Sequence, residues 1–249
     1  MDLQLKDKII IVSGGSRGIG GGIVKALLAE GAIPVVIDRS APDSSGVANF
    51  VAELTDPAAC ENAIKAAIEK YGRIDGLVNN AGVNDGVGLE NGSYEQFIAS
   101  LHKNLVHYYL LAKFALPELK KSKGAIVNIS SKVAETGQGN TSAYAAANGG
   151  RNALTREWAV ELLPYAIRVN AVIVAECWTP LYESWIKTVP NPEEKLKSIV
   201  SKIPLEQRMT KAEEIANMVT FLLSEKSSHT TGQLIHVDGG YTHLDRAIS

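Results

Sequence analysis

This sequence of 249 residues has only two cysteines and no excess of either charge. The two cysteines, Cys60 and Cys177, belong to no CxxC or Cys/His spacing, which excludes a disulfide framework and a zinc site of the usual spacing. The 25 lysines and arginines nearly balance the 27 aspartates and glutamates, so we expect neither a nucleic acid nor an anionic membrane as partner. The histidines show no ligand spacing either, and we expect no metal: His102, His107, His229, His236 and His243.

Long apolar runs are also missing. No stretch of about 18 uninterrupted apolar residues occurs, so we expect no membrane span. Residues 1–8 alternate charge with leucine, which is unlike a signal peptide. These absences predict a cytoplasmic protein. The hydrophobic fraction of 45% is enough for the core of one domain over residues 1–249.

Short β-branched runs alternate with longer helical segments along the chain. The runs at 8–12, 33–37, 76–79, 124–129, 167–173 and 234–237 predict strands. Helical spacing covers 23–30, 94–119, 142–163 and 212–223, and Asp56 with Pro57 indicates the start of another helix that ends near Lys70. Such repeated units predict a doubly wound α/β domain of the Rossmann type, with a parallel sheet and helices on both faces. The polar segment 179–208 interrupts the alternation and is either a surface excursion or a lid over a substrate.

A glycine-rich turn follows the first strand and opens the first helix. Glycines allow a tight turn and close approach of a pyrophosphate to the helix N-terminus, although an ordinary glycine turn is the alternative. The turn comprises Gly14, Ser16, Arg17, Gly18, Ile19 and Gly20. Asp38, at the end of the second strand, is placed to accept hydrogen bonds from ribose hydroxyls and favours NAD over NADP. Arg17 and Arg39 oppose that choice, because either could contact a phosphate.

Several motifs, in order, resemble the short-chain dehydrogenase/reductase family. The glycine spacing is GxxxGxG, and the remaining matches are Glu53-Leu54, Asn79 to Gly82, Asn104, Asn128 to Ser131, Tyr144 and Val237 to Gly240. Together they cover essentially the whole chain. The stretches 83–86, 107–109, 136–142, 155–158 and 241–246 further resemble bacterial L-fucose dehydrogenases within that family.

The resemblance implies a role for each matching residue. Tyr144 would exchange a proton with the substrate hydroxyl, Ser131 would hold the substrate oxygen, and Asn104 would bind a water of the proton relay. Thr179 would contact the nicotinamide, and Tyr144 and position 148 would also touch the cofactor. The other implied cofactor contacts are Glu53, Leu54, Asn80, Ala81 and Gly82. The family commonly forms tetramers, so we expect a homotetramer.

Two positions depart from the family pattern. Asn148 replaces the lysine that the family places four residues after the tyrosine, and Val174-Ala175 replaces Pro-Gly. A phenol has a pKa near 10 and needs a nearby positive charge to act as a base at neutral pH, which asparagine does not supply. The nearest cation along the helix is Arg151, and the sequence leaves its direction open. We therefore expect NAD binding to survive and turnover to be strongly reduced.

Polar residues would surround the substrate if this fold is right. They are Asn84, Gln138, Asn140 and Glu176, with Trp178 close by, and they join Ser131 and Tyr144. Amides and carboxylates suit a polyhydroxylated substrate better than an apolar one, which favours oxidation of an L-fucose-like aldose to a lactone. Two alternatives stay open: a catalytically silent NAD-binding protein, and a reductase of another carbonyl such as a 3-oxoacyl thioester.

Overall fold

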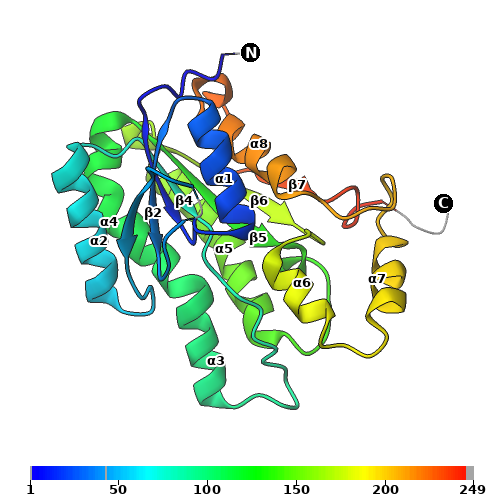
Figure 1. Cartoon of the computed structure of the whole chain (residues 1–249). Helices are drawn as coiled ribbons and strands as arrows, with labels where there is room; N and C mark the ends of the chain where they lie inside the picture. Colours follow the sequence, from blue (N-terminus) through cyan, green and yellow to red (C-terminus); the bar gives the residue numbers. More distant parts are fainter. Residues whose placement is uncertain (1, 43, 245–249) are drawn as a thin grey trace.

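A seven-stranded, fully parallel sheet forms the centre of the protein, in the order β3-β2-β1-β4-β5-β6-β7 (Figure 1). The computed structural model describes residues 2–42 and 44–244. The strands are β1 Ile9–Ser13, β2 Ile33–Asp38, β3 Ala48–Val51, β4 Gly76–Asn79, β5 Ala125–Ser131, β6 Arg168–Val174 and β7 Leu234–Val237. The strand order reverses between β1 and β4, which confirms the doubly wound Rossmann-type fold.

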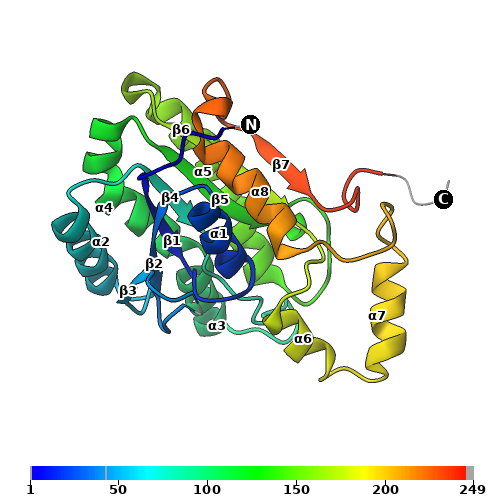
Figure 2. The same cartoon turned by 45° about the horizontal axis from the view of Figure 1, so that its top comes forward.

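Helices cover both faces of the sheet. Helices α1 (Gly18–Ala29) and α8 (Ala212–Leu223) pack on one face, and α2 (Pro57–Tyr71), α4 (His107–Ser122) and α5 (Ser142–Glu161) pack on the other (Figures 1 and 2). The side chains of β1 explain this division, because successive residues of a strand point to opposite faces. Ile10 and Val12 join the core beneath α1 and α8, whereas Ile9 and Ile11 join the opposite core.

Local sequence decides several helix ends. The Asp56 side chain accepts a hydrogen bond from the Ala58 amide at 2.9 Å, and Pro57 occupies the first turn of α2. That helix ends at Gly72, whose φ of 71° is left-handed, and Gly31 has the same conformation after α1. The predicted helix at 94–119 is divided into α3 (Tyr94–Leu101), a π-helical turn at His102–Val106, and α4. Periodicity alone gives no indication of that π turn.

One strand was not predicted. Strand β3, with the sequence Ala-Asn-Phe-Val, lies at the sheet edge and is half-buried to exposed, so it lacks the apolar run that marks the central strands. The short helical turns Lys132–Ala134, Leu163–Tyr165 and Glu225–Ser227 complete the described elements. Within residues 2–42 and 44–244, no helix has the length and apolar character needed to cross a bilayer.

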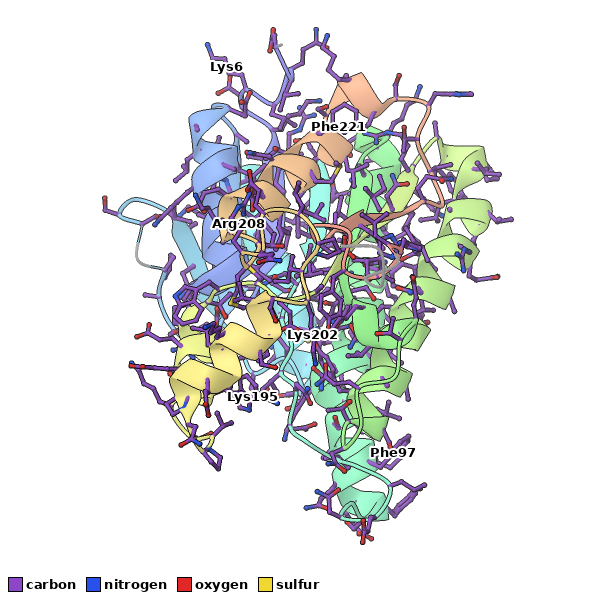
Figure 3. The ribbon with its side chains drawn as sticks, turned by 90° about the vertical axis from the view of Figure 1, so that its right-hand side faces the viewer. Lys6, Phe97, Lys195, Lys202, Arg208 and Phe221 are labelled. Carbon is purple, nitrogen blue, oxygen red and sulfur yellow. The ribbon has the colours of Figure 1, made fainter. Side chains whose placement is uncertain are left out.

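The interrupted segment 179–208 contains two helices, α6 (Pro180–Ile186) and α7 (Pro192–Val200). Both stand to one side of the main body, beyond the carboxyl ends of the strands (Figures 1 and 2). The chain returns at Leu205, whose amide donates to the Gly239 carbonyl at 2.9 Å. Arg208 then contacts Glu214 in the first turn of α8 at 2.6 Å, while Lys195 lies out on α7 (Figure 3). A lid role for this segment stays a prediction.

Candidate functional site

The glycine-rich turn lies at the point where the strand order reverses, between the end of β1 and the start of α1. Gly14 has a left-handed φ of 64°, and a Cβ at Gly20 would lie 2.1 Å from the Gly14 carbonyl oxygen. No residue other than glycine fits at position 20 without moving the turn. The result is an open backbone cradle at a helix N-terminus, which suits a pyrophosphate.

Asn80 joins this turn to the loop after β4. Its Nδ2 donates to the carbonyls of Ser13 and Gly14, both at 3.0 Å. Ala81 packs so closely that a Cβ on Gly14 would lie 2.9 Å from its Cα. From the other side, the Thr179 side chain lies 3.7 Å from the position of a Cβ on Gly18. The fold thus places the residues predicted to contact the pyrophosphate and the nicotinamide around one turn.

Asp38 ends β2 beside the same turn. Its Oδ2 accepts a hydrogen bond from the Ser16 amide at 3.1 Å, and its Oδ1 accepts one from the Arg39 amide at 2.7 Å. The exposed Arg39 guanidinium lies 3.9 Å from the Glu53 carboxylate, so a charge of opposite sign faces it already. Leu54 is buried next to Glu53. These residues could hold the adenosine part of a nicotinamide dinucleotide.

The predicted catalytic residues come from three elements. Ser131 ends β5, Tyr144 lies in the first turn of α5, and both are half-buried. Asn104 is fully buried in the π turn, where its Oδ1 accepts from the Val83 amide at 2.7 Å and its Nδ2 donates to the Ser100 carbonyl at 3.0 Å. A π turn releases backbone carbonyls from the helical ladder and occurs often at functional sites.

Asn148 makes its side-chain hydrogen bonds inside the protein. The residue is fully buried, its Nδ2 donates to the Tyr144 carbonyl at 2.8 Å, and its Oδ1 accepts from Arg151 Nη1 at 3.0 Å. Val174, at the second departure from the family pattern, is buried at the end of β6 in register with Ser131.

The sequence did not reveal the position of Arg151. Its side chain turns inward and is 2% exposed, and its Nε donates to the Asn104 carbonyl at 2.6 Å. The guanidinium carbon lies 4.3 Å from the centre of the Tyr108 ring. Burial, and secondly the Arg151 charge, lower the pKa of His107 to about 3, so that imidazole is neutral. Burial raises the pKa of Tyr108, and Arg151 opposes that rise.

The predicted substrate residues occupy two loops and the end of β6. Asn84, Gln138 and Asn140 are exposed, and the loops that carry them meet where the Ala143 amide donates to the Val87 carbonyl at 3.2 Å. The left-handed Asn140, with φ of 53°, packs against Gly88. Glu176 and Trp178 follow β6. Residues 245 and 246 of the predicted motif 241–246 lie outside the described residues.

A buried ion pair next to Ser131 was missed from the sequence. Lys132, only 7% exposed, contacts the Glu176 carboxylate, and its Nζ lies 4.0 Å from the centre of the Tyr241 ring. Burial and then the Glu176 charge raise the pKa of Tyr182. The Tyr182 ring packs edge-on against Trp185 at 5.1 Å and lies 6.0 Å from Trp178. Charged and aromatic side chains therefore adjoin the end of β5.

Comparison with known proteins agrees with this geometry. A family model described as enoyl-(acyl carrier protein) reductase matches residues 14–242. The chain belongs to the short-chain dehydrogenase/reductase family.

Among solved members of the short-chain dehydrogenase/reductase family, the crystal structure of Cj0485 dehydrogenase has a TM-score of 0.96 and 46% identity, covering 99% of this chain and 98% of that one. The ligand-free aldohexose dehydrogenase of Thermoplasma acidophilum has a TM-score of 0.93 and 32% identity, with the same coverage. An L-fucose dehydrogenase of Bos taurus is 34% identical over 96% of this chain and 91% of its own length. A 3-oxoacyl-(acyl-carrier-protein) reductase of Thermotoga maritima is 33% identical over 96% and 99%.

The close approach at Gly20 gives a first test of the cradle. We expect Gly20→Ala to weaken NADH binding by at least about tenfold, because the added methyl must displace the Gly14 carbonyl or Asn80. Gly21→Ala is the matched control, since a Cβ there would lie 3.6 Å from its nearest neighbour. NADH fluorescence titration measures both variants. Equal affinity of Gly20→Ala and wild type would contradict a cofactor role for this turn.

Proposed function

We propose that this short-chain dehydrogenase/reductase oxidises a hydroxyl of a sugar with NAD, converting an L-fucose-like aldose to its lactone. The observation that carries the proposal is the Lys132–Glu176 pair beside the aromatic side chains of Trp178, Tyr182 and Trp185. A site with charged groups pairs with hydroxyls and disfavours molecules that lack them, while aromatic rings contact the C–H faces of a sugar. The relatives named for L-fucose and aldohexose support the same substrate class.

The proposed roles follow the positions of the side chains. Tyr144, in the first turn of α5, takes the proton from the substrate hydroxyl, and Ser131, at the end of β5, donates a hydrogen bond to the substrate oxygen. Bound NAD supplies the nicotinamide carbon that accepts the hydride. The cradle of Gly14 to Gly20, with Asn80, Thr179 and Asp38, holds the dinucleotide. Asn104, buried and fixed through Val83 and Ser100, orders the proton path.

Asn148 should make turnover slower than in a relative that has the family lysine at this position. Its amide carries no charge and is occupied by the Tyr144 carbonyl and by Arg151. NAD binding is expected to persist because the glycine-rich cradle and Asp38 are both present. In the limit of no turnover the chain would be a silent NAD-binding protein.

Reduction of a 3-oxoacyl thioester is the second candidate. The family model and the Thermotoga maritima reductase favour it, with 33% identity for the latter. The charged pair next to Ser131 disfavours it, because a pocket for an acyl chain is lined mostly by apolar side chains.

We expect the protein to work as a homotetramer. Large apolar side chains are exposed on α4, on α5 and in the turn that follows, and another subunit could cover them: Tyr109, Val160 and Leu163.

Substrate oxidation and the role of Tyr144 can be tested together. We expect L-fucose and related aldoses with NAD to raise the NADH absorbance at 340 nm, while apolar alcohols do not. Tyr144→Phe removes the proton acceptor and should lower kcat by about 100-fold or more. Tyr94→Phe changes an exposed tyrosine at the start of α3 and serves as the control. Faster turnover of 3-oxoacyl thioesters than of any aldose would reverse the assignment.

The preference for NAD should depend on the charge of Asp38. Asp38→Asn keeps an oxygen that can accept from the Ser16 amide but removes the charge that repels a 2′-phosphate. We expect the ratio of kcat/KM for NAD over NADP to fall by about tenfold or more. Glu61→Gln, in a surface pair with Lys65 on α2, is the charge-matched control. An unchanged ratio would remove Asp38 from cofactor selection.

A further inference from the structure

Arg151 is a buried cation without a counter-charge. Its nitrogens donate to neutral oxygens: Nε to the Asn104 carbonyl, and Nη1 to Asn148 Oδ1 and, at 3.2 Å, to the Ile129 carbonyl. Nη2 is buried and has no hydrogen-bond partner within the described part of the chain. No carboxylate of residues 2–42 and 44–244 lies within ion-pair distance of the guanidinium. A buried charge in such surroundings is costly, which indicates a role for it.

The guanidinium lies against Gly82, in the loop after β4 that contacts the glycine-rich turn. Gly82 is exposed, and a Cβ on Gly82 would lie 2.8 Å from Arg151 Nη2 and 2.9 Å from Asn104 Oδ1. Asn80 and Ala81, in the same loop, contact the glycine-rich turn. The positive charge therefore lies next to Gly82, the residue that follows Ala81 in this loop.

Helix geometry links Arg151 to the position that lacks a lysine. Residues 144, 148 and 151 follow the spacing i, i+4 and i+7, so their side chains share one face of α5. The hydrogen bond from Nη1 to Asn148 Oδ1 shows that a group at 151 reaches the space beside residue 148. A lysine at 148 would meet this guanidinium as a second cation.

We propose that Arg151 supplies, from one turn further along α5, the positive charge that the family pattern places at position 148. It acts as a positioning residue: its positive charge favours the anionic NAD molecule, and its hydrogen bonds hold Asn148 and the π turn in place. The inference rests on the proposed dehydrogenase function for its kinetic part, but its effect on NADH binding is independent of any substrate.

Variants that remove the positive charge from position 151, or place one at position 148, test this role. We expect Arg151→Met to weaken NADH binding and to lower kcat/KM, each by between about tenfold and hundredfold. Moving the charge back, in Asn148→Lys/Arg151→Met, should restore NADH affinity and raise kcat to the wild-type value or above it. Asn148→Lys alone should gain little, because two cations would then adjoin. Arg156→Met, at an exposed arginine of the same helix, is the control.

The outcomes distinguish the role of Arg151 from the proposed oxidation of an aldose. If Arg151→Met binds NADH like wild type, or if the double variant recovers thermal stability but not NADH affinity, Arg151 is structural and the inference is wrong. If no variant oxidises any aldose while NADH affinity follows the charge, the proposed substrate is wrong and the inference stands. Should Arg151→Met fail to fold, Arg151→Lys must retain NADH affinity and Arg151→Gln must lose it.

A second site is built from residues distant in sequence. Glu135, His236 in β7 and His243 after it bring their ligand atoms within 4.8 Å of one another. His236 Nε2 lies 3.0 Å from Glu135 Oε2, and the two imidazole rings are 4.2 Å apart. The three border a cavity of about 490 Å³ whose other lining residues include Gly149 and Asn152, and none of the lining belongs to the glycine-rich turn.

We infer that this cluster binds a divalent transition metal such as Zn²⁺, although the histidine spacing in the sequence predicted none. Two imidazoles and a carboxylate are donors that Zn²⁺ accepts, with a water in the fourth position. Ligand atoms about 2.0–2.2 Å from one ion lie closer together than 4.8 Å, so His243, which is exposed, must turn inward. The bound metal would join the segment after β7 to the loop after β5.

Calorimetric titration with ZnCl₂ tests this second site. We expect one Zn²⁺ per chain, a higher melting temperature that EDTA reverses, and unchanged NADH affinity. Glu135→Gln and His243→Ala should each weaken binding at least about tenfold, whereas His229→Ala, at an exposed histidine elsewhere, should not. Zn²⁺ that fails to bind, or that binds these two variants as tightly as wild type, would overturn the assignment.

Discussion

The contact between the loop after β4 and the turn after β1 determines where the functional site can form. Two carbonyls of that turn, those of Ser13 and Gly14, accept hydrogen bonds from one amide, Asn80 Nδ2, at 3.0 Å each. The strands that lead into the two loops are neighbours in the sheet, so their carboxyl ends necessarily lie side by side. Glycine at 14 and 20 leaves room for this contact and for a ligand at the same time, because a side chain would fill either space.

Polar groups buried between the sheet and α5 extend the same arrangement toward the catalytic residues. Asn79 donates to Asn128 at 3.0 Å, and Asn128 donates to Thr155 at 2.9 Å, so β4, β5 and α5 are joined in the core. Each buried amide that loses such a partner costs about 1–3 kcal/mol, which holds α5 in one orientation on the sheet. That orientation in turn places Tyr144 near the end of β5 and turns Arg151 inward.

Charge is distributed unusually around this site. The family pattern places a cation at 148, and this chain has a neutral amide there with a guanidinium three residues later. On the substrate side, a second buried cation, Lys132, is neutralised by Glu176. One cation is thus paired and adjoins the proposed sugar, whereas the other is unpaired and adjoins the proposed cofactor. The paired Lys132 suits recognition of a neutral sugar, whereas the unpaired Arg151 suits stabilisation of the negative charge of the cofactor.

Sequence alone determined the doubly wound α/β fold class, the glycine-rich turn, Asp38 at the end of β2 and the family. These features depend on local periodicity and on motifs of fixed spacing. It missed β3, whose half-exposed edge position removes the apolar run, and the π turn, which the helical spacing does not mark. Tertiary structure decided which partners Lys132 and Arg151 have, and that Glu135 and His236, 101 residues apart, make contact. The direction of a long side chain depends on burial and on neighbours that the fold brings from other strands, and no pattern along the chain contains that information.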